Sequence, residues 1–212
     1  MEEVCVGDGR RKRCREGTYN LGVSLVLIVV AYLLGSLNFG VLVARSRGVD
    51  IYSEGSGNPG TSNVMRVLGK KLAAVVLLGD GAKGAIAAAL GASVIDPAFG
   101  YVTLFVAVVG HAFPVWHRFR GGKSVATAIG GLLYLAPPVG AILAGIWIVT
   151  LVVWKTASIG SLIVMALMVP LLAITGRNRS ELAWSAAIAI FVVARHSSNI
   201  KLLLNASERK VS

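Results

Sequence analysis

Charged residues are missing from three long stretches of this 212-residue chain. No Asp, Glu, Lys or Arg occurs at positions 17–44, 124–154 or 156–176. The chain is 55% hydrophobic and its mean hydropathy is +0.73, which is more apolar than a soluble domain of this length. A membrane-spanning helix needs roughly 20 apolar residues. The uncharged stretches therefore exclude an ordinary soluble fold and predict an all-α polytopic membrane protein.

Acidic residues are also scarce. The 10 Asp and Glu residues stand against 21 Lys and Arg residues, which leaves a net charge of +11. In a soluble protein this excess would suggest a nucleic-acid partner. In a membrane protein, lipid headgroups and the preference of cations for the cytoplasmic side explain the same excess. We therefore expect the lipid bilayer, and no nucleic acid, as the partner.

Cysteine is nearly absent, because Cys5 and Cys14 are the only two in the chain and both lie close to its start. Two cysteines in a tail make neither a disulfide framework nor a metal site. We assign them no function, and we expect no metal and no cofactor. Residues 1–18 also carry five cations, so we predict a basic, disordered tail at 1–18 and a single transmembrane domain at 19–212.

Seven apolar segments follow the tail. The tail resembles the basic start of a signal peptide, but the first apolar run exceeds 20 residues and ends without a small-residue cleavage site, so we expect it to stay as an uncleaved span. Pro137-Pro138 separates the fourth segment from the fifth, and the fourth is short enough to be a half-span. The expected spans are 20–43, 72–93, 99–115, 125–136, 139–154, 157–175 and 182–194.

Cations cluster at 45–71, 116–123, 155 and 195–210. By the positive-inside rule these segments lie in the cytoplasm, and they contain most of the polar residues that could form a site. Seven spans with a cytoplasmic C-terminal end put the N-terminus outside, whereas the five cations of the tail favour the inside. Either the internal loops dominate the orientation, or the tail is an artefact of the chosen start codon.

The segment Gly55-Ser56-Gly57-Asn58-Pro59-Gly60-Thr61-Ser62-Asn63 is the first candidate site. Its three glycines allow positive φ and close backbone approach, so that consecutive N–H groups can face one concavity. Thr61, Ser62 or Asn63 can cap a short helix that begins just after, and a helix start favours phosphate or carboxylate. The alternative is a flexible linker, against which the turn-forming Asn58, Pro59 and Asn63 argue.

A second glycine-containing basic segment is Gly121-Gly122-Lys123. Two glycines can bring backbone amides close to a phosphate while the lysine supplies a point charge. The segment is not a P-loop, because that motif needs glycine at position 117, where this chain has His117. The alternative is a cation-rich boundary of the membrane.

Polar residues inside or beside the spans complete the candidates. Ser36 and Asn38 lie toward the same end of the first span as Arg45, whereas Gly35 and Gly40 could serve close helix packing alone. In the second span, Asp80 and Lys83 are three residues apart and could form an ion pair, or line the site. The C-terminal segment adds His196, Asn199 and Glu208.

The content and order of these segments resemble the motifs of one protein family. The chain has Gly35-Ser36-Leu37-Asn38-Phe39-Gly40 with Arg45, Gly48-Val49-Asp50-Ile51, Gly55 to Val64 with Arg66, Gly110-His111-Ala112-Phe113-Pro114-Val115, Phe119-Arg120-Gly121-Gly122-Lys123-Ser124-Val125-Ala126-Thr127, and Arg195-His196 with Asn199-Ile200. In content and order these motifs resemble the bacterial acyl-phosphate:glycerol-3-phosphate acyltransferases, integral membrane enzymes that begin phosphatidic acid synthesis. The likeness covers about residues 20–210.

The chain departs from the family pattern at four places. Tyr52 stands where the family usually has Arg, and Thr61-Ser62 replaces Ala-Thr. Ser124 replaces a Gly and Leu202 replaces an Arg. Two lost cations could weaken phosphate binding, and Ser124 could misplace its neighbour Lys123 if the position needs positive φ.

The resemblance implies transfer of a fatty acyl group from acyl-phosphate to the 1-hydroxyl of sn-glycerol 3-phosphate, in a bacterial plasma membrane. The products would be 1-acylglycerol 3-phosphate and phosphate, with neither coenzyme A nor acyl carrier protein as direct donor. Because acyl-phosphate is already activated, positioning and charge stabilisation could supply most of the acceleration. The active site would face the cytoplasm.

The resemblance and the chemistry assign roles to individual residues. Gly55 to Gly60, Arg45 and the turn at Lys123 would divide the two phosphates, and Ser36, His196 and Asn199 would orient the hydroxyl or the carbonyl. His196 is a candidate base or a helix-end histidine, and a substrate phosphate could be the base instead. The expected catalytic residues are Ser36, Arg45, Lys123, His196 and Asn199, the substrate-binding residues are Gly55, Ser56, Gly57, Asn58, Gly60, Thr61, Asn63, Gly121 and Gly122, and Glu208 is structural and pairs with a basic loop.

Two other functional classes stay open. A transporter of an anionic metabolite would need a polar path across the bilayer, whereas the polar residues of this chain gather near one predicted face. A weakened paralogue that still binds glycerol phosphate is supported only by the departures from the family pattern.

Overall fold

The computed structural model of the protein describes residues 5–6, 13–14 and 20–211. In the tail, Cys5–Val6 (β1) pairs antiparallel with Arg13–Cys14 (β2), with Cys5 opposite Cys14. The expectation of a disordered tail otherwise lies outside the described residues and stays a prediction.

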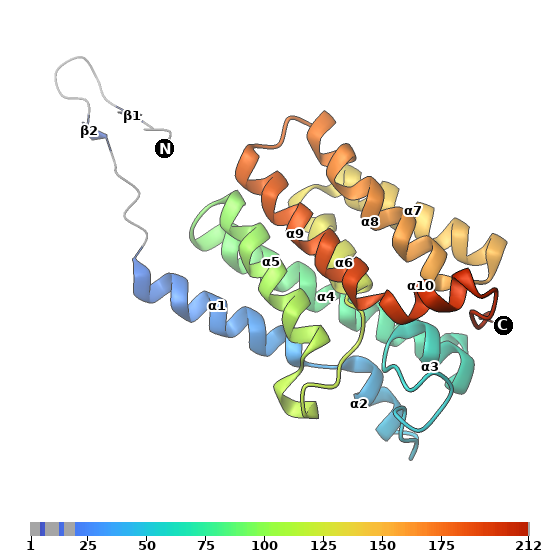
Figure 1. The fold of residues 1–212 in the computed structure, drawn as a ribbon. Coiled ribbons are helices and arrows are strands. Elements are labelled where there is room, and N and C mark those ends of the chain that lie inside the picture. Colours follow the sequence, from blue (N-terminus) through green and yellow to red (C-terminus); the bar gives the residue numbers. More distant parts are fainter. Residues whose placement is uncertain (1–4, 7–12, 15–19, 212) are drawn as a thin grey trace.

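The remainder of the described chain is helical (Figure 1). Its elements are α1 Leu21–Ser36, α2 Phe39–Arg45, α3 Thr61–Leu68, α4 Lys70–Val94, α5 Pro97–Ala112, the 3₁₀ turn η1 Val115–His117, α6 Val125–Leu135, α7 Pro137–Trp154, α8 Ala157–Ile174, α9 Arg179–Arg195 and α10 Ser197–Leu204. The predicted all-α fold is confirmed.

The expected number of seven spans is not confirmed. Within the described residues, five helical segments are long and apolar enough to cross a membrane, or up to six if α9 and α10, which are bent by 57°, form one broken span. The predicted fourth span is α6, an apolar helix of 11 residues. At 1.5 Å per residue such a helix covers roughly half of a 30 Å hydrocarbon core. This length agrees with the expected half-span.

The first span is interrupted where the sequence predicts one continuous helix. α1 ends at Ser36 and α2 begins at Phe39. Asn38 caps α2, because its side-chain oxygen accepts a hydrogen bond of 3.2 Å from the N–H of Val41. The break leaves the carbonyl of Leu37 free to accept a hydrogen bond of 2.5 Å from Lys83. A polar cap inside an apolar run therefore bends the chain at one end of the bundle.

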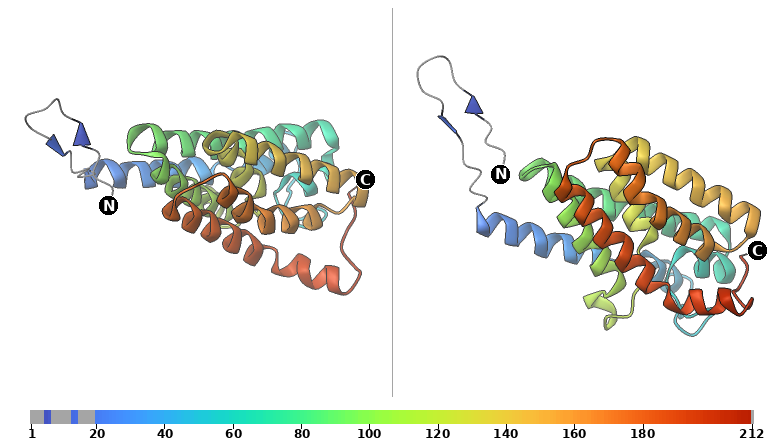
Figure 2. Two further views of the ribbon diagram at one scale, coloured as in Figure 1. Left: turned by 90° about the horizontal axis from the view of Figure 1, so that it is seen from above. Right: turned by 45° about the horizontal axis from the view of Figure 1, so that its top comes forward.

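Small residues bring the helices close together. A Cβ on Gly84 of α4 would lie 2.0 Å from the carbonyl oxygen of Thr127 in α6, so only glycine fits at this contact. The same holds for Gly35 of α1, where a Cβ would lie 2.2 Å from the carbonyl oxygen of Ala107 in α5. Gly35 thus serves close helix packing, which was one of the alternatives left open for it. Helix α4 packs against α1, α5 and α6 at the centre of the bundle (Figures 1 and 2).

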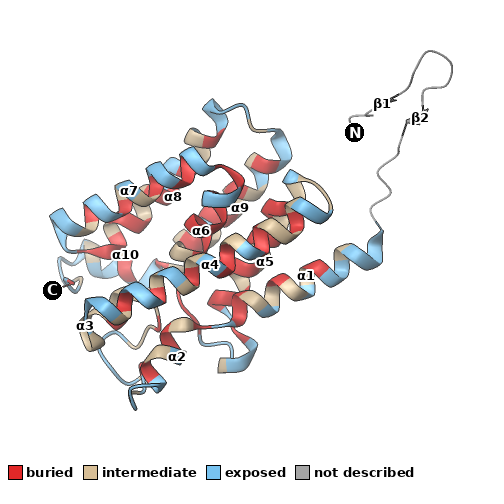
Figure 3. Cartoon of the chain, turned by 180° about the vertical axis from the view of Figure 1, so that it is seen from behind, coloured by how far each residue is buried: buried red, intermediate tan, exposed pale blue. Residues whose placement is uncertain are grey.

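Burial follows the pattern of a membrane bundle. The inward faces of the helices are buried and the outward faces are exposed (Figure 3). Many of the exposed residues are large and apolar. Leu78, Ile174 and Ile190 are examples, with 72%, 81% and 70% of their surface exposed. Exposed apolar surface of this extent is expected where lipid is the solvent. The protein is a multi-pass integral membrane protein.

The polar segments gather at one end of this bundle. Helices α2, α3 and α10 and the C-terminus lie together there (Figure 1). The C-terminal residues are tied down by long-range contacts, since the guanidinium of Arg66 donates to the carbonyls of Arg209 at 2.7 Å and Lys210 at 3.0 Å. The N–H of Val211 also donates to the carbonyl of Lys155 at 2.6 Å. The C-terminal segment therefore packs at the same end of the bundle as residues 55–63, the glycine loop.

Candidate active site

A cavity of about 870 Å³ opens at the polar end of the bundle and continues between the helices. Its apolar wall comes from α4, α6 and α7, with Leu77, Ile129, Leu133, Trp147 and Ile148. Its polar wall contains Ser56, Asn58, Gly60, Thr61, Asn63, Arg66, Lys123, His196, Asn199 and Glu208. The cavity can therefore hold an anionic head and an apolar chain in one molecule.

The glycine loop, residues 55–63, is held in a defined turn by its own hydrogen bonds, which argues against a flexible linker. Gly55 and Gly57 have φ of 58° and 68°, in the left-handed region that favours glycine. The side chain of Asn63, 2% exposed, accepts from the N–H of Ser56 at 2.8 Å and donates to the carbonyl of Glu54 at 2.9 Å. The side-chain amide of Asn63 therefore forms hydrogen bonds within the loop. Asn63, which was predicted to bind substrate, stabilises the loop instead.

The helix after the loop starts one to three residues earlier than predicted. Gly60 is the N-cap of α3, and within the described residues no side chain caps this helix. Thr61, Ser62 and Asn63, which were expected to cap, are its first three residues. The side chain of Asn58 accepts from the N–H of Gly60 at 2.9 Å and shapes the turn instead. The uncapped first turn lines the cavity, where its N–H groups and partial positive charge favour an anion.

A chain of polar contacts crosses the cavity mouth. The ammonium of Lys123 donates to the side-chain oxygen of Asn199, and the amide nitrogen of Asn199 donates to Glu208 at 2.6 Å. Burial lowers the pKa of Lys123 to about 8, and the charge of Glu208 opposes this shift. The second carboxylate oxygen of Glu208 is buried without a partner among the described residues. Glu208, expected only to pair with a basic loop, thus lines the cavity.

His196 lies between α9 and α10 and is 3% exposed. Its Nδ1 lies 2.7 Å from the carbonyl of Val192, so Nδ1 carries the hydrogen and Nε2 is left as an acceptor. His196 is thus a helix-end histidine bonded to a carbonyl, and it also lines the cavity. Its role as a base stays a prediction.

Gly121 and Gly122 have a different role from the one predicted. Neither is among the residues that line the cavity, and both are buried. A Cβ on Gly121 would lie 2.1 Å from the carbonyl oxygen of His111, and one on Gly122 would lie 2.2 Å from Nε2 of His111. The N–H of Gly122 donates to the same carbonyl at 3.1 Å. These glycines allow the turn to pack on His111, whose carbonyl already accepts the N–H of Gly122.

Ser124 occupies the position where the family has glycine. Its φ is 64°, so the position does require the left-handed conformation. The hydroxyl donates to the carbonyl of Val108 at 2.7 Å, which anchors the start of α6 to α5. Serine therefore preserves the turn that follows Lys123.

Two predicted catalytic residues are not brought to this cavity. Arg45 lines a separate cavity of about 480 Å³, together with Tyr52, His117 and Arg120. Ser36 is fully buried and lines neither cavity, and its hydroxyl accepts from the N–H of Val115 at 3.5 Å. The predicted sharing of two phosphates between Arg45 and Lys123 has no support in this arrangement.

Tyr52, which replaces a family arginine, joins two loops. Its hydroxyl donates to the carbonyl of Arg120 at 2.7 Å, and the Arg120 guanidinium lies 5.1 Å from the ring centre. Burial raises the pKa of Tyr52. The substitution thus exchanges a cation for a contact between the segments that precede Gly55 and Gly121.

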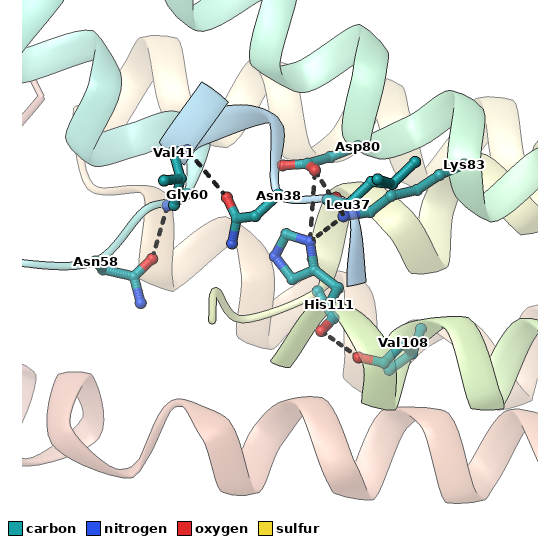
Figure 4. Close-up of polar contacts among 10 residues, drawn as sticks. Leu37, Asn38, Val41, Asn58, Gly60, Asp80, Lys83, Val108 and His111 are labelled. Carbon is teal, nitrogen blue, oxygen red and sulfur yellow. Dashed lines mark hydrogen bonds and ion pairs between the residues drawn. The ribbon is translucent and has the colours of Figure 1, made fainter. Parts of the chain in front are cut away.

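Asp80 and His111 both line the cavity. The sequence left Asp80 open as an ion-pair partner or a site residue, and it assigned no role to His111. The Asp80–Lys83 ion pair expected from the spacing is present at 2.9 Å, and His111 joins it (Figure 4). Asp80 is therefore both a partner in the ion pair and part of the cavity wall, whereas Lys83 lies behind it. The sequence did show His111 within the Gly110-His111 motif. It did not predict which residue a histidine in this apolar helix would contact. Among the described residues, no group of His, Cys, Asp or Glu side chains could hold a metal ion.

Comparison with known proteins agrees with these features. The model of the glycerol-3-phosphate acyltransferase family matches residues 25–206. Glycerol-3-phosphate acyltransferase of Pseudomonas syringae pv. tomato is 44% identical over 187 residues, which cover 87% of this chain and 96% of the relative. The Pseudomonas fluorescens protein of the same name is 42% identical over 189 residues, covering 87% of this chain and 97% of the relative.

Solved structures show the same fold. The crystal structure of PlsY (YgiH), an integral membrane glycerol 3-phosphate acyltransferase, in its glycerol 3-phosphate form matches with a TM-score of 0.85 and 33% identity. That match covers 89% of this chain and 96% of the other. The lysophosphatidic acid form of PlsY matches with a TM-score of 0.82 and 34% identity over 88% of this chain and 94% of the other.

Proposed function

Because this chain belongs to the glycerol-3-phosphate acyltransferase family, we propose that it transfers a fatty acyl group from acyl-phosphate to the 1-hydroxyl of sn-glycerol 3-phosphate. The products are 1-acylglycerol 3-phosphate, a lysophosphatidic acid, and inorganic phosphate. The names of the relatives support the acyl acceptor, and the two forms of PlsY contain an acceptor and a product of this reaction. The choice of acyl-phosphate as donor rests on the resemblance of the motifs.

The shape of the cavity is the observation that carries the proposal. Its polar end combines the uncapped start of α3 with Lys123 and Arg66, which suits phosphate. Its apolar end lies between α4, α6 and α7, which suits an acyl chain that enters from the bilayer. A molecule with a phosphate at one end and an alkyl chain at the other fits both walls at once.

The reaction needs little covalent chemistry from the protein. The 1-hydroxyl oxygen attacks the carbonyl carbon, a new ester bond forms, and the bond between that carbon and the phosphate oxygen breaks. Lys123 stabilises the charge that develops on the leaving phosphate, and Asn199 holds Lys123 in place. The hydroxyl proton has two acceptors in this arrangement, Nε2 of His196 and a phosphate oxygen of the donor.

We place the protein in the bacterial plasma membrane with the mouth of the cavity toward the cytoplasm. The segments at that end carry Arg66, Lys123, Arg209 and Lys210, and such an excess of cations favours the cytoplasmic side. A cytoplasmic mouth would also receive glycerol 3-phosphate, a soluble anion, directly from water.

A donor comparison tests the proposal. Purified protein in detergent is incubated with glycerol 3-phosphate and either palmitoyl-phosphate or palmitoyl-CoA, and lysophosphatidate and released phosphate are measured. We expect product and phosphate in equal amounts with palmitoyl-phosphate, and no product with palmitoyl-CoA. Equal rates with both donors would refute the proposed donor. A rate of phosphate release that does not depend on glycerol 3-phosphate would refute the proposed acceptor.

A further inference from the structure

Three ionisable side chains meet in the interior of the bundle. Asp80 and Lys83 come from α4 and His111 comes from the end of α5, and only 1%, 2% and 3% of their surfaces are exposed. Ionisable groups inside membrane-spanning helices are costly, and they persist where they pair and serve a function. The proposed reaction uses none of the three side chains. Their position beside the cavity therefore calls for an explanation.

Lys83 is the centre of this group. Its ammonium lies 2.5 Å from the carbonyl of Leu37, 2.7 Å from Nδ1 of His111 and 2.9 Å from a carboxylate oxygen of Asp80 (Figure 4). An ammonium has three N–H donors, so each donor has one acceptor. His111 Nδ1 faces both this ammonium and, at 3.4 Å, the carboxylate of Asp80. These two contacts hold the ring of His111 in one direction.

His111 contacts the Gly121-Gly122 turn, which precedes Lys123. Its carbonyl accepts from the N–H of Gly122 at 3.1 Å. A Cβ on Gly122 would lie 2.2 Å from Nε2 of the ring, so the ring and the backbone are in direct contact. Any rotation of the ring would push on Gly122, and the next residue along the chain is Lys123.

We propose that Asp80, Lys83 and His111 are positioning residues for the acyl transfer, which act by holding the Gly121-Gly122 turn and so placing Lys123 at the cavity. The proposal rests on the proposed function, since it assigns these residues to the same site. The arrangement links three separate segments, because the ammonium that orients His111 also holds the carbonyl of Leu37 at the break between α1 and α2.

Kinetics of three variants give the first test. Asp80→Asn and His111→Ala remove the anion and the acceptor, whereas His111→Asn keeps an oxygen near the position of Nδ1. We expect Asp80→Asn and His111→Ala to lower kcat roughly 10- to 100-fold, the loss typical of a misplaced catalytic group. We expect KM for glycerol 3-phosphate to change less than kcat, and His111→Asn to recover part of the loss. Loss in KM alone would overturn the proposal.

A double-mutant cycle separates positioning from general stability. In a Lys123→Ala background there is no ammonium left to place, so Asp80→Asn should lower kcat by no more than about threefold further. Glu181→Gln is the matched control, because Glu181 is also buried but belongs to the capping box of α9. Losses by Asp80→Asn that are equally large with and without Lys123 would show a structural role only and overturn the proposal.

Chemical labelling provides a test that does not depend on activity. The intact protein is labelled with isotopic acetic anhydride near pH 8, and acetylation of Lys123 is compared with that of the exposed Lys155 in the same sample. We expect Asp80→Asn and His111→Ala to change the relative rate at Lys123 severalfold, and Glu181→Gln to leave it unchanged. An unchanged rate in Asp80→Asn would overturn the proposal. A changed rate in a protein that makes no lysophosphatidate would refute the proposed function and retain the positioning of Lys123.

Discussion

At the scale of single residues, Lys123 offers the sharpest test of the proposed chemistry. Its ammonium lies at the cavity, in contact with Asn199, where the charge on a leaving phosphate would grow. We expect Lys123→Ala to lower kcat by about 2–4 kcal/mol of transition-state stabilisation, as for other preorganised electrostatic groups. Lys123→Arg should recover only part of the lost kcat, because a planar guanidinium does not replace a compact ammonium. Steady-state kinetics with palmitoyl-phosphate measures both.

The split between kcat and KM decides the role of Lys123. If Lys123→Ala raised KM for glycerol 3-phosphate and left kcat intact, Lys123 would be a ground-state phosphate anchor. The transition-state charge would then have to be stabilised by His196, Asn199 or the start of α3.

The pH dependence of the reaction follows from the same residue. Burial lowers the pKa of Lys123 to about 8, so the charged form is lost as the pH rises through that value. We expect kcat/KM to fall above about pH 8, since this ratio reports the pKa values of the free enzyme. Lys123→Arg should show a flat profile over the same range, because guanidinium stays charged. A wild-type profile that stays level to pH 9.5, after correction for spontaneous hydrolysis of the donor, would contradict this assignment.

The sequence predicts the kinds of residue in the site better than their roles. Gly55 and Gly57 have the positive φ that the motif suggested, because only local backbone geometry is involved. Gly122 looks like another phosphate-binding glycine, yet it faces His111, a partner 11 positions away in the chain. Arg45 belongs to the motif but lies at a different cavity. The direction of a long side chain depends on tertiary contacts that the sequence does not encode locally.

At the scale of elements, the start of α6 tests whether serine truly replaces the family glycine. Ser124 bears a left-handed backbone, which costs roughly 1–2 kcal/mol, and its hydrogen bond to Val108 returns about 1 kcal/mol. We therefore expect Ser124→Gly to change the free energy of unfolding by less than about 1 kcal/mol. Ser124→Ala keeps the strain without the bond and should destabilise by about 1 kcal/mol. Thermal unfolding in detergent compares the two, and greater stability of the alanine variant would refute this account.

The helices themselves were largely predictable, and their interruptions were not. Each of the seven apolar segments is helical, since long apolar runs in a membrane have few alternatives. The break at Asn38 depends on two contacts: the Asn38 side chain caps α2, and Lys83 of α4 donates to the carbonyl of Leu37. The shift of the α3 cap to Gly60 likewise depends on the bracing of the loop by Asn58 and Asn63.

At the scale of the whole molecule, sequence patterns could not predict the contacts between the C-terminal segment and residues 55–66. Arg66 bonds to Lys210 across 144 positions, and a side-chain donor of Arg209 reaches the carbonyl of Gly55. These contacts place the C-terminal tail beside the glycine loop. The two segments must therefore lie on the same side of the membrane, whichever side that is.

The orientation of the molecule gives the last prediction. In a background without Cys5 and Cys14, single cysteines are introduced at Ser56 in the glycine loop, at Ser207 in the tail and at Thr175 between α8 and α9. The positive-inside rule puts the first two in the cytoplasm, and α8 carries the chain to the opposite end before Thr175. In intact cells, an impermeant thiol reagent should label Thr175→Cys and spare Ser56→Cys and Ser207→Cys.

Inverted vesicles should reverse this labelling pattern, which controls for burial of the introduced thiols. Ser207 is exposed, so protection in both preparations would not come from packing of its side chain. If Ser56→Cys and Ser207→Cys were both labelled from outside, the polar end would face away from the cytoplasm and the proposed access of glycerol 3-phosphate would be wrong. If only one of them were labelled, the C-terminal tail could not lie beside the glycine loop, and the contacts of Arg66 and Arg209 would not hold in the membrane.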